Sequence, residues 1–164
     1  MSTECNAQRV AILVDTSNIY RATKLKYQAR IDYKQLRMEI AKKRPLVRAI
    51  AFVEHNEDMD VTPFLDALQL SGFETRIRYT NKTNEGKTSY GTWNVGIALH
   101  AVQLMSKVDC IAIVSGNGYL VDLLDFLSQH GVRSEVYGIE NFMHRDLVTQ
   151  ADESFTLSTH CILK

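Results

Sequence analysis

The chain has 164 residues, with nineteen Lys and Arg against nineteen Asp and Glu, and 45% of its residues are hydrophobic. This length suits one domain, which can bury roughly two thirds of its unfolded surface without a stabilising disulfide or metal. The balanced charge gives no overall indication of a nucleic-acid partner, although a local basic patch is compatible with it.

Cysteine spacing and apolar segments exclude several classes of protein. Cys5, Cys110 and Cys161 are widely spaced and form no CxxC pair, which argues against a disulfide framework or a zinc site. No segment reaches the roughly 20 apolar residues of a membrane span, and the polar residues 1–9 contain no signal-peptide core. We therefore expect a cytoplasmic protein.

The first half of the chain alternates predicted strands and helices. Residues 10–15, VAILVD, have the pattern of a buried parallel strand that ends in an acid. Helix-capping side chains at 16–18 and 32 precede helical stretches, the second over residues 33–43, and a second strand covers 47–53. A polar loop over 54–60 then leads to a helix that opens at Thr62-Pro63 and ends at Gly72, followed by an alternating, half-exposed edge strand over 73–79.

The second half continues the alternation after a polar loop over residues 80–91. The expected elements are a helix with an apolar stripe from Trp93 to Leu104, a strand at 109–115, a helix at 120–129, a last core strand at 132–137, a short helix at 145–149 and a small strand at 154–157. This order predicts a single α/β domain over residues 1–164, a three-layer α/β/α sandwich with a mostly parallel central sheet.

Parallel sheets bind ligands at the carboxyl ends of their strands, near the point where the strand order reverses. The residues expected to meet there are Asp15, Ser17, Asn18, Ser115 and Asn117. An acid that closes a central strand can bind Mg²⁺, so Asp15 is the best metal candidate. It can equally well cap the following helix, and the sequence does not separate these two interpretations.

Two further segments suggest contacts with a nucleic acid. The turn Ser115-Gly-Asn-Gly118 places backbone N–H groups at a helix N-terminus, which suits a phosphate, although such turns are more often simply tight loops. The segment from Arg76 to Trp93 mixes cations with aromatic rings, the chemistry of a single-stranded nucleic-acid track. We favour this role for Lys82 and Lys87, whereas packing at the helix start is the stronger interpretation for Trp93.

The order of these signals resembles the NYN domain family, a branch of the PIN-like nuclease superfamily. The matching segments cover nearly the whole chain: 14–20 (VDTSNIY), 93–101 (WNVGIALHA), 113–118 (IVSGNG), 131–138 (GVRSEVYG) and 147–152 (LVTQAD). The resemblance implies a PIN-like sandwich whose acidic residues converge at the strand ends to hold Mg²⁺ or Mn²⁺ and hydrolyse RNA with an activated water.

Several acids that are usual in this family are replaced here. The resemblance assigns catalytic positions to Asp15, Asn18, Asn94 and Asn117, and nucleic-acid contacts to Ser17, Lys82, Lys87, Trp93 and Ser115. The acids usual at Asn94, His100, Asn117 and Tyr119 are absent, so only Asp15 keeps its charge. Neutral side chains do not create the field that holds two metals, and a weak single Mg²⁺ or Mn²⁺ at Asp15 and Asn117 is the expectation.

Three hypotheses follow from these features. The first is a ribonuclease with a reduced metal site, and the second is a pseudo-nuclease that binds single-stranded RNA. The third is a non-catalytic regulatory module that binds another protein or forms a homodimer. We favour RNA binding, with catalysis in doubt, and ask whether Asp122 or Asp152 replaces a missing acid.

Overall fold

The structure is a computed structural model that describes residues 8–56, 58–82, 88–89 and 92–163. For residues 80–82 and 88–89 it describes the backbone alone. Lys87 and Tyr90, which belong to the predicted nucleic-acid track, lie outside the described residues.

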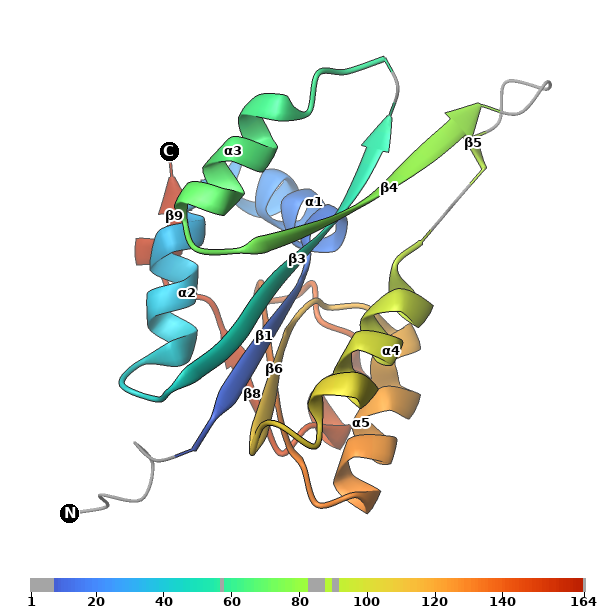
Figure 1. The fold of residues 1–164 in the computed structure, drawn as a ribbon. Helices are drawn as coiled ribbons and strands as arrows, with labels where there is room; N and C mark the ends of the chain where they lie inside the picture. The colour runs from blue at the N-terminus through green and yellow to red at the C-terminus, as the bar shows by residue number, and fades with distance from the viewer. Residues whose placement is uncertain (1–7, 57, 83–87, 90–91, 164) are drawn as a thin grey trace.

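A seven-stranded sheet forms the centre of the molecule, in the order β5-β4-β3-β1-β6-β7-β8 (Figure 1). Six of its strands run parallel: β1 (Val10–Asp15), β3 (Leu46–Asn56), β4 (Glu74–Lys82), β6 (Cys110–Val114), β7 (Arg133–Gly138) and β8 (Glu153–Thr156). The two-residue β5 (Thr88–Ser89) pairs antiparallel with the end of β4, and a separate pair joins β2 (Arg30–Ile31) to β9 (Ile162–Leu163).

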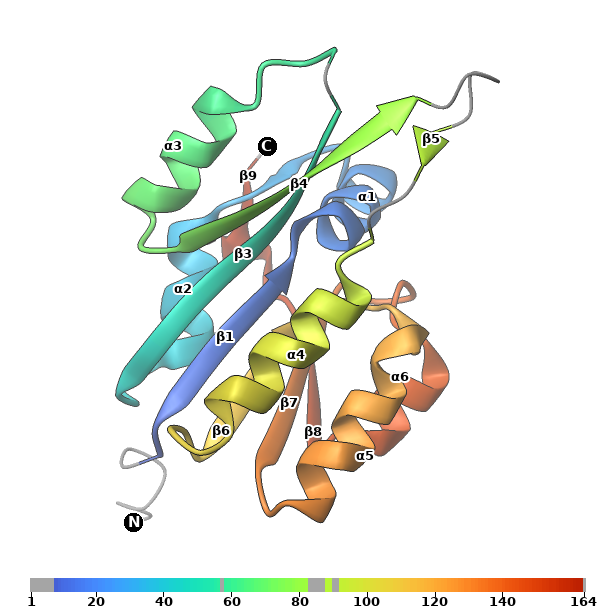
Figure 2. The ribbon, with the colours of Figure 1, turned by 45° about the vertical axis from the view of Figure 1, so that its right-hand side comes forward.

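Helices cover both faces of this sheet, which confirms the predicted three-layer α/β/α sandwich. One face packs against α1 (Thr16–Tyr27), α2 (Tyr33–Ala41) and α3 (Thr62–Leu70). The other face, turned toward the viewer in Figure 2, packs against α4 (Asn94–Leu104), α5 (Val121–Gln129) and α6 (Arg145–Gln150). Short 3₁₀ turns are η2 (Gly118–Leu120) and η3 (Thr159–Cys161). No described helix is both long and apolar enough to cross a membrane.

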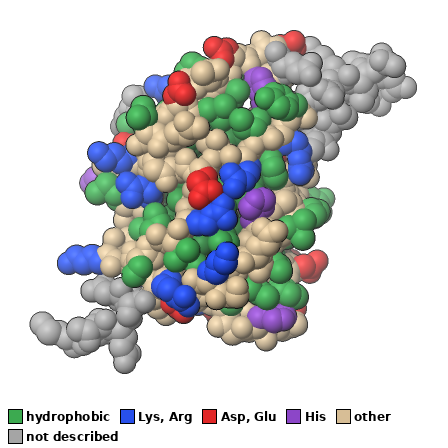
Figure 3. All heavy atoms as spheres, in the orientation of Figure 1, with side chains coloured by type: hydrophobic (Ala, Val, Ile, Leu, Met, Phe, Trp, Pro, Cys, Tyr) green, Lys and Arg blue, Asp and Glu red, His purple; other side chains and the backbone are tan. Residues whose placement is uncertain are grey.

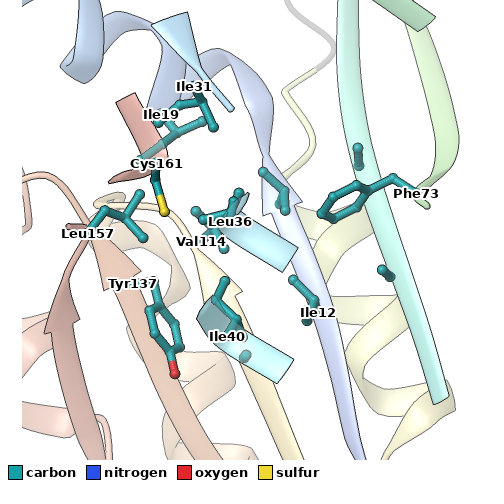
Figure 4. Packing of buried hydrophobic residues seen from close by; sticks show 14 of the residues in the cluster. Ile12, Ile19, Ile31, Leu36, Ile40, Phe73, Val114, Tyr137, Leu157 and Cys161 are labelled. Carbon is teal, nitrogen blue, oxygen red and sulfur yellow. The ribbon is translucent and has the colours of Figure 1, made fainter. Parts of the chain in front are cut away.

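The alternation of side chains along β1 divides the core into two layers. Ile12 and its neighbours at 10 and 14 belong to one cluster with Leu36 and Ile40 of α2. Figure 4 shows Ile12, Leu36 and Ile40 in this cluster. Ala11 and Leu13 belong to the opposite cluster with residues of α4 and α5. Every residue of β1 from Val10 to Val14 is fully buried, which explains why this strand is a continuous apolar run rather than an alternating one.

Asp32 caps α2 as predicted, whereas residues 16–18, which we expected as caps, form the first turn of α1. Asp15 caps α1, since its Oδ1 accepts a hydrogen bond from the Asn18 N–H at 3.3 Å. Asp32 caps α2 in the same way through the Gln35 N–H at 3.1 Å. Gly72 adopts φ +91 where α3 ends, a left-handed conformation that favours glycine.

Strand boundaries differ from the sequence predictions in two places. The expected polar loop over 54–60 begins too early, because β3 continues to Asn56 where its backbone pairs with Arg78, Tyr79 and Thr80 of β4. β4 likewise continues to Lys82, into the expected loop over 80–91, and its Thr80 pairs with Asn56 of β3. Parallel pairing between distant segments decides both boundaries, and local sequence patterns do not contain that information. Residues 133–138 form the last buried strand, β7, as predicted, and the small strand predicted at 154–157 is β8, whose residues are mostly exposed.

A buried ion pair connects the turn that follows α2 to strand β7. The Arg44 guanidinium donates two hydrogen bonds of 2.9 Å each, one to each carboxylate oxygen of Glu135. The two side chains are 6% and 5% exposed. The Tyr137 hydroxyl also donates to Glu135 Oε1 at 3.0 Å. Burial alone would raise the pKa of Glu135, but the hydrogen bonds and charge of Arg44 outweigh it and lower the pKa.

Candidate strand-end site

The candidate site is a pocket where the strand order reverses, between β1 and β6 at the carboxyl end of the sheet. Its volume is about 230 Å³. Its lining combines two carboxylates, three amides, two hydroxyls and one guanidinium: Asp15, Ser17, Asn18, Arg21, Glu54, Thr92, Asn94 and Asn117. Most of the polar residues selected from the sequence therefore meet in one place.

Asp15 lies at the inner end of this pocket and is 7% exposed. Its Oδ1 accepts the capping bond from Asn18, and its Oδ2 accepts a bond from the Ser115 hydroxyl at 3.2 Å. Burial raises the pKa of Asp15, while the hydrogen bonds from Asn18 and Ser115 oppose the rise. The helix-capping role is thus present in the structure, and it leaves one lone pair on each oxygen for a ligand.

A network of hydrogen bonds continues from Asp15 across the pocket. Ser115 is fully buried, so its side chain cannot touch RNA directly; it accepts the Asn117 N–H at 3.1 Å. Asn117 then donates from Nδ2 to Asn94 Oδ1 at 2.9 Å, and its own Oδ1 accepts the Tyr119 N–H at 3.0 Å. The two asparagines, at positions where the resemblance implies acids, therefore bond to each other, and Asn117 also bonds to the backbone.

The glycine turn after β6 is shaped by packing inside the protein. The Gly116 N–H donates to Asn18 Oδ1 at 2.8 Å, and a Cβ on Gly116 would lie 1.9 Å from the Phe142 carbonyl oxygen. A Cβ on Gly118 would lie 2.6 Å from the His144 ring. Since the N–H groups of residues 116, 117 and 119 all have internal partners, this turn does not offer them to a phosphate.

Glu54 joins the site, although we interpreted it from the sequence as part of a solvated loop. It is half-buried in β3 and lines the pocket beside Asp15. Burial and the nearby charge of Asp15 raise the pKa of Glu54, against a hydrogen bond from Ser17 and the charges of Arg78 and Arg21. A signal was available in the sequence: Glu54 directly follows an apolar strand, as Asp15 does.

The basic and aromatic residues near the pocket differ in their contacts, and only some of them line it. The Arg78 guanidinium lies 4.2 Å from the centre of the Trp93 ring and donates to the Thr92 carbonyl oxygen. The Trp93 Nε1 donates to the Val53 carbonyl at 3.0 Å, so this half-buried ring braces the start of α4. Lys82 belongs to β4, but its side chain is not described. Arg21 is exposed and lines the pocket, although the sequence analysis did not select it.

Neither of the two acids considered as replacements lines the pocket. Asp122 lies on the exposed side of α5. Asp152 accepts hydrogen bonds from the Ser134 N–H at 2.8 Å and its hydroxyl at 3.4 Å, near the start of β7 at the other end of the sheet. His100 has a structural role, since its Nδ1 lies 2.7 Å from the Gly96 carbonyl oxygen. Glu54 is the acid that accompanies Asp15.

The donor set limits which metal the pocket could hold. No group of three or more His, Cys, Asp and Glu side chains within the described residues has a metal-binding arrangement. Asp15 and Glu54 fit one hydrated Mg²⁺ or Mn²⁺, which needs only one or two protein carboxylates. The amide oxygens of Asn94 and Asn117 already accept hydrogen bonds, so this set does not fit the two-metal arrangement of a full nuclease centre.

Comparisons with known proteins address the fold and the family. The structure of a protein of unknown function from Vibrio parahaemolyticus is similar, with 26% identity and a TM-score of 0.86, over 99% of this chain and 100% of that one. The nicotinamidase of Staphylococcus aureus reaches a TM-score of 0.43 at 12% identity, over 91% of this chain and 99% of that one, which supports no statement about this chain. The comparison with curated proteins gives no match.

The family comparison agrees with the fold and with the segments that meet at the pocket. The NYN domain profile matches residues 9–159, nearly the whole chain. The match includes the segments that carry Asp15, Asn94 and Asn117, and the parallel sheet has helices on both faces. This chain belongs to the NYN domain family, a PIN-like nuclease family.

Proposed function

We propose that this NYN domain binds single-stranded RNA at the strand-end pocket and has lost most of its family's hydrolytic capacity. The observation that carries the proposal is the Asn94–Asn117 amide pair, which occupies positions that the family usually fills with acids. Two neutral amides bonded to each other leave the pocket without the dense negative charge that recruits two metals.

The charge balance of the pocket favours a phosphate over a metal cluster. Asp15 and Glu54 contribute two acids, and the Arg21 and Arg78 charges act on the same region. The pocket is therefore close to neutral, so a phosphate can approach Arg21 without first needing metal ions to screen repulsion. The face shown in Figure 3 carries Lys and Arg among acidic and hydrophobic side chains.

Weak metal binding is compatible with this function. Asp15 and Glu54 would hold a single Mg²⁺ or Mn²⁺, and their raised pKa values make each of them hold its proton more tightly than an exposed acid does. When bound, such an ion would polarise an RNA phosphate and lower the pKa of a water ligand. The protein's own contribution is to position the two carboxylates and keep Arg21 at the pocket edge.

Fluorescence anisotropy with a labelled 12-nucleotide RNA in excess chelator tests the proposal. We expect binding to persist in chelator, to weaken with salt, and to fall about tenfold in Arg21→Gln, with a salt slope smaller by about one. The matched control is Lys107→Gln, an exposed cation after α4 at the opposite end of the sheet. Absence of RNA binding at low salt, or equal loss in both variants, would refute the proposal.

A second candidate function is binding of a protein partner, including a second copy of the chain. A groove of about 540 Å³ beside the pocket is lined by Val95, Leu99 and Tyr119, whose exposed fractions are 70%, 59% and 85%. Exposed apolar side chains of this kind can mark interaction surfaces. Sedimentation of the wild type and Leu99→Ser over a range of concentrations tests it: a monomer throughout would count against self-assembly.

A further inference from the structure

A second cavity adjoins the strand-end pocket on the α1 and α3 side. Its volume is about 350 Å³, within the range of small-molecule sites. Ser17 and Glu54 line both cavities, so the two lie side by side at the end of β3. A ligand in one cavity therefore contacts side chains that also line the other.

Helical spacing in α1 sends side chains into both cavities. Ser17 and Tyr20 lie three residues apart and line the second cavity, whereas Ser17 and Arg21 lie four apart and line the strand-end pocket. Tyr20 thus offers an aromatic ring to one cavity while the adjacent Arg21 offers a cation to the other. This is the arrangement that a nucleotide needs, with a ring for the base and a charge for the phosphate.

The second cavity has apolar walls and an acidic edge. Tyr20 is 55% exposed and Met59 71% exposed, and the half-buried Phe64 ring closes the hollow from α3. The polar groups on the edge include the carboxylates of Glu54 and Asp60. The described lining residues include no Lys or Arg, so Glu54 and Asp60, which only accept hydrogen bonds when ionised, carry the formal charge at this edge, beside the neutral polar side chain of Asn56.

We propose that this second cavity binds a nucleobase that carries an exocyclic amino group, in preference to uracil. Adenine, cytosine and guanine each present an exocyclic amino donor that a carboxylate accepts, whereas the edge donor of uracil, its N3–H, lies between two carbonyl oxygens that a carboxylate repels. Tyr20 and Met59 cover the faces of the base, and Asp60 reads its edge. The inference rests on the proposed RNA binding and adds the class of base that the same site selects.

Amide NMR titrations with AMP, CMP, GMP and UMP test the inference without requiring RNA. In the wild type we expect the three amino-bearing nucleotides to bind at least about fivefold more tightly than UMP. Tyr20→Ala should weaken all four about tenfold by removing the stacking surface. Asp60→Asn should bring the ratio toward one, because the amide can donate to a uracil carbonyl.

The control is Asp66→Asn, which makes the same charge change on the exposed side of α3, outside the cavity lining. UMP binding as tight as that of the other nucleotides, or no nucleotide binding at all, would overturn the inference. The outcomes also separate the two proposals. RNA binding that depends on Arg21 but shows no base preference removes this cavity's role alone, whereas the expected nucleotide ranking without RNA binding removes only the RNA function.

Discussion

The Arg44–Glu135 ion pair and the two acids of the strand-end pocket differ in how their charges are compensated. On the α2 side of β7, Arg44 and Glu135 lie 2.9 Å apart, and Tyr137 donates to the same carboxylate. At the strand ends, Asp15 and Glu54 are like charges, and burial together with the charge of Asp15 raises the pKa of Glu54. The first region pairs every charge, while the second keeps two acids together at the wall of an open pocket.

The difference separates a stabilising site from a functional one. Burial opposes ionisation in both regions, but at Glu135 the bidentate arginine reverses its effect and lowers the pKa. At Asp15 burial is opposed only by neutral hydrogen-bond donors, and the pKa remains raised. A protein retains such an unfavourable arrangement when a ligand uses it, which makes the strand-end pocket the place to look for function.

The largest expected effect is the loss of stability when the Arg44–Glu135 ion pair is broken. Glu135→Gln leaves Arg44 buried without its counter-charge, and we expect a loss of about 3–5 kcal/mol in the free energy of unfolding. Urea denaturation at pH 7 measures it. Glu153→Gln, which removes the 51%-exposed partner of Arg133, is the control and should change stability by less than about 1 kcal/mol.

The pH dependence of Glu135→Gln sharpens this prediction. Because the pKa of Glu135 is lowered on folding, its stabilisation is present above its unfolded pKa and is lost as the pH falls through the folded pKa. The stability difference between wild type and variant should therefore shrink in acid. A difference that stays constant down to low pH would mean that lost packing, rather than lost charge, causes the effect.

An intermediate effect is expected for metal binding at the like-charged region. Glu54→Gln removes one of two carboxylates, and we expect Mn²⁺ affinity to fall about tenfold, close to 1.4 kcal/mol. Calorimetric titration measures the change, with Glu140→Gln as an exposed acid outside the pocket. Mn²⁺ affinity that is unchanged in Glu54→Gln would exclude this residue as a ligand.

The smallest expected effect is a gain in stability. Asp15→Asn removes a desolvated charge and keeps an acceptor for the α1 cap, so we expect the Tm at pH 7 to rise by roughly 2–4 °C. Because the folded pKa of Asp15 is raised, the penalty exists only above its unfolded pKa and disappears as the pH falls. Thermal melts at pH 7 and in acid measure both points. A lower Tm for Asp15→Asn at pH 7 would contradict the comparison.

Most of the fold could be predicted because it depends on local patterns. The apolar run that ends at Asp15 and the caps at Asp15 and Asp32 are properties of neighbouring residues. The pairing of Arg44 with Glu135 joins residues 91 positions apart, and no local pattern indicates it. Glu54 lies between these cases, since its position after an apolar strand was visible, but its proximity to Asp15 depends on the register between β1 and β3.

The Trp93 ring gives the protein a built-in optical reporter. It is the chain's one tryptophan, its indole N–H is bonded to the Val53 carbonyl, and the Arg78 guanidinium covers its face. Thr92 and Asn94, its two neighbours in the chain, both line the strand-end pocket. Movement of Arg78 toward a bound phosphate would uncover the indole and change its emission, so occupancy of the pocket can be followed in unlabelled protein by fluorescence.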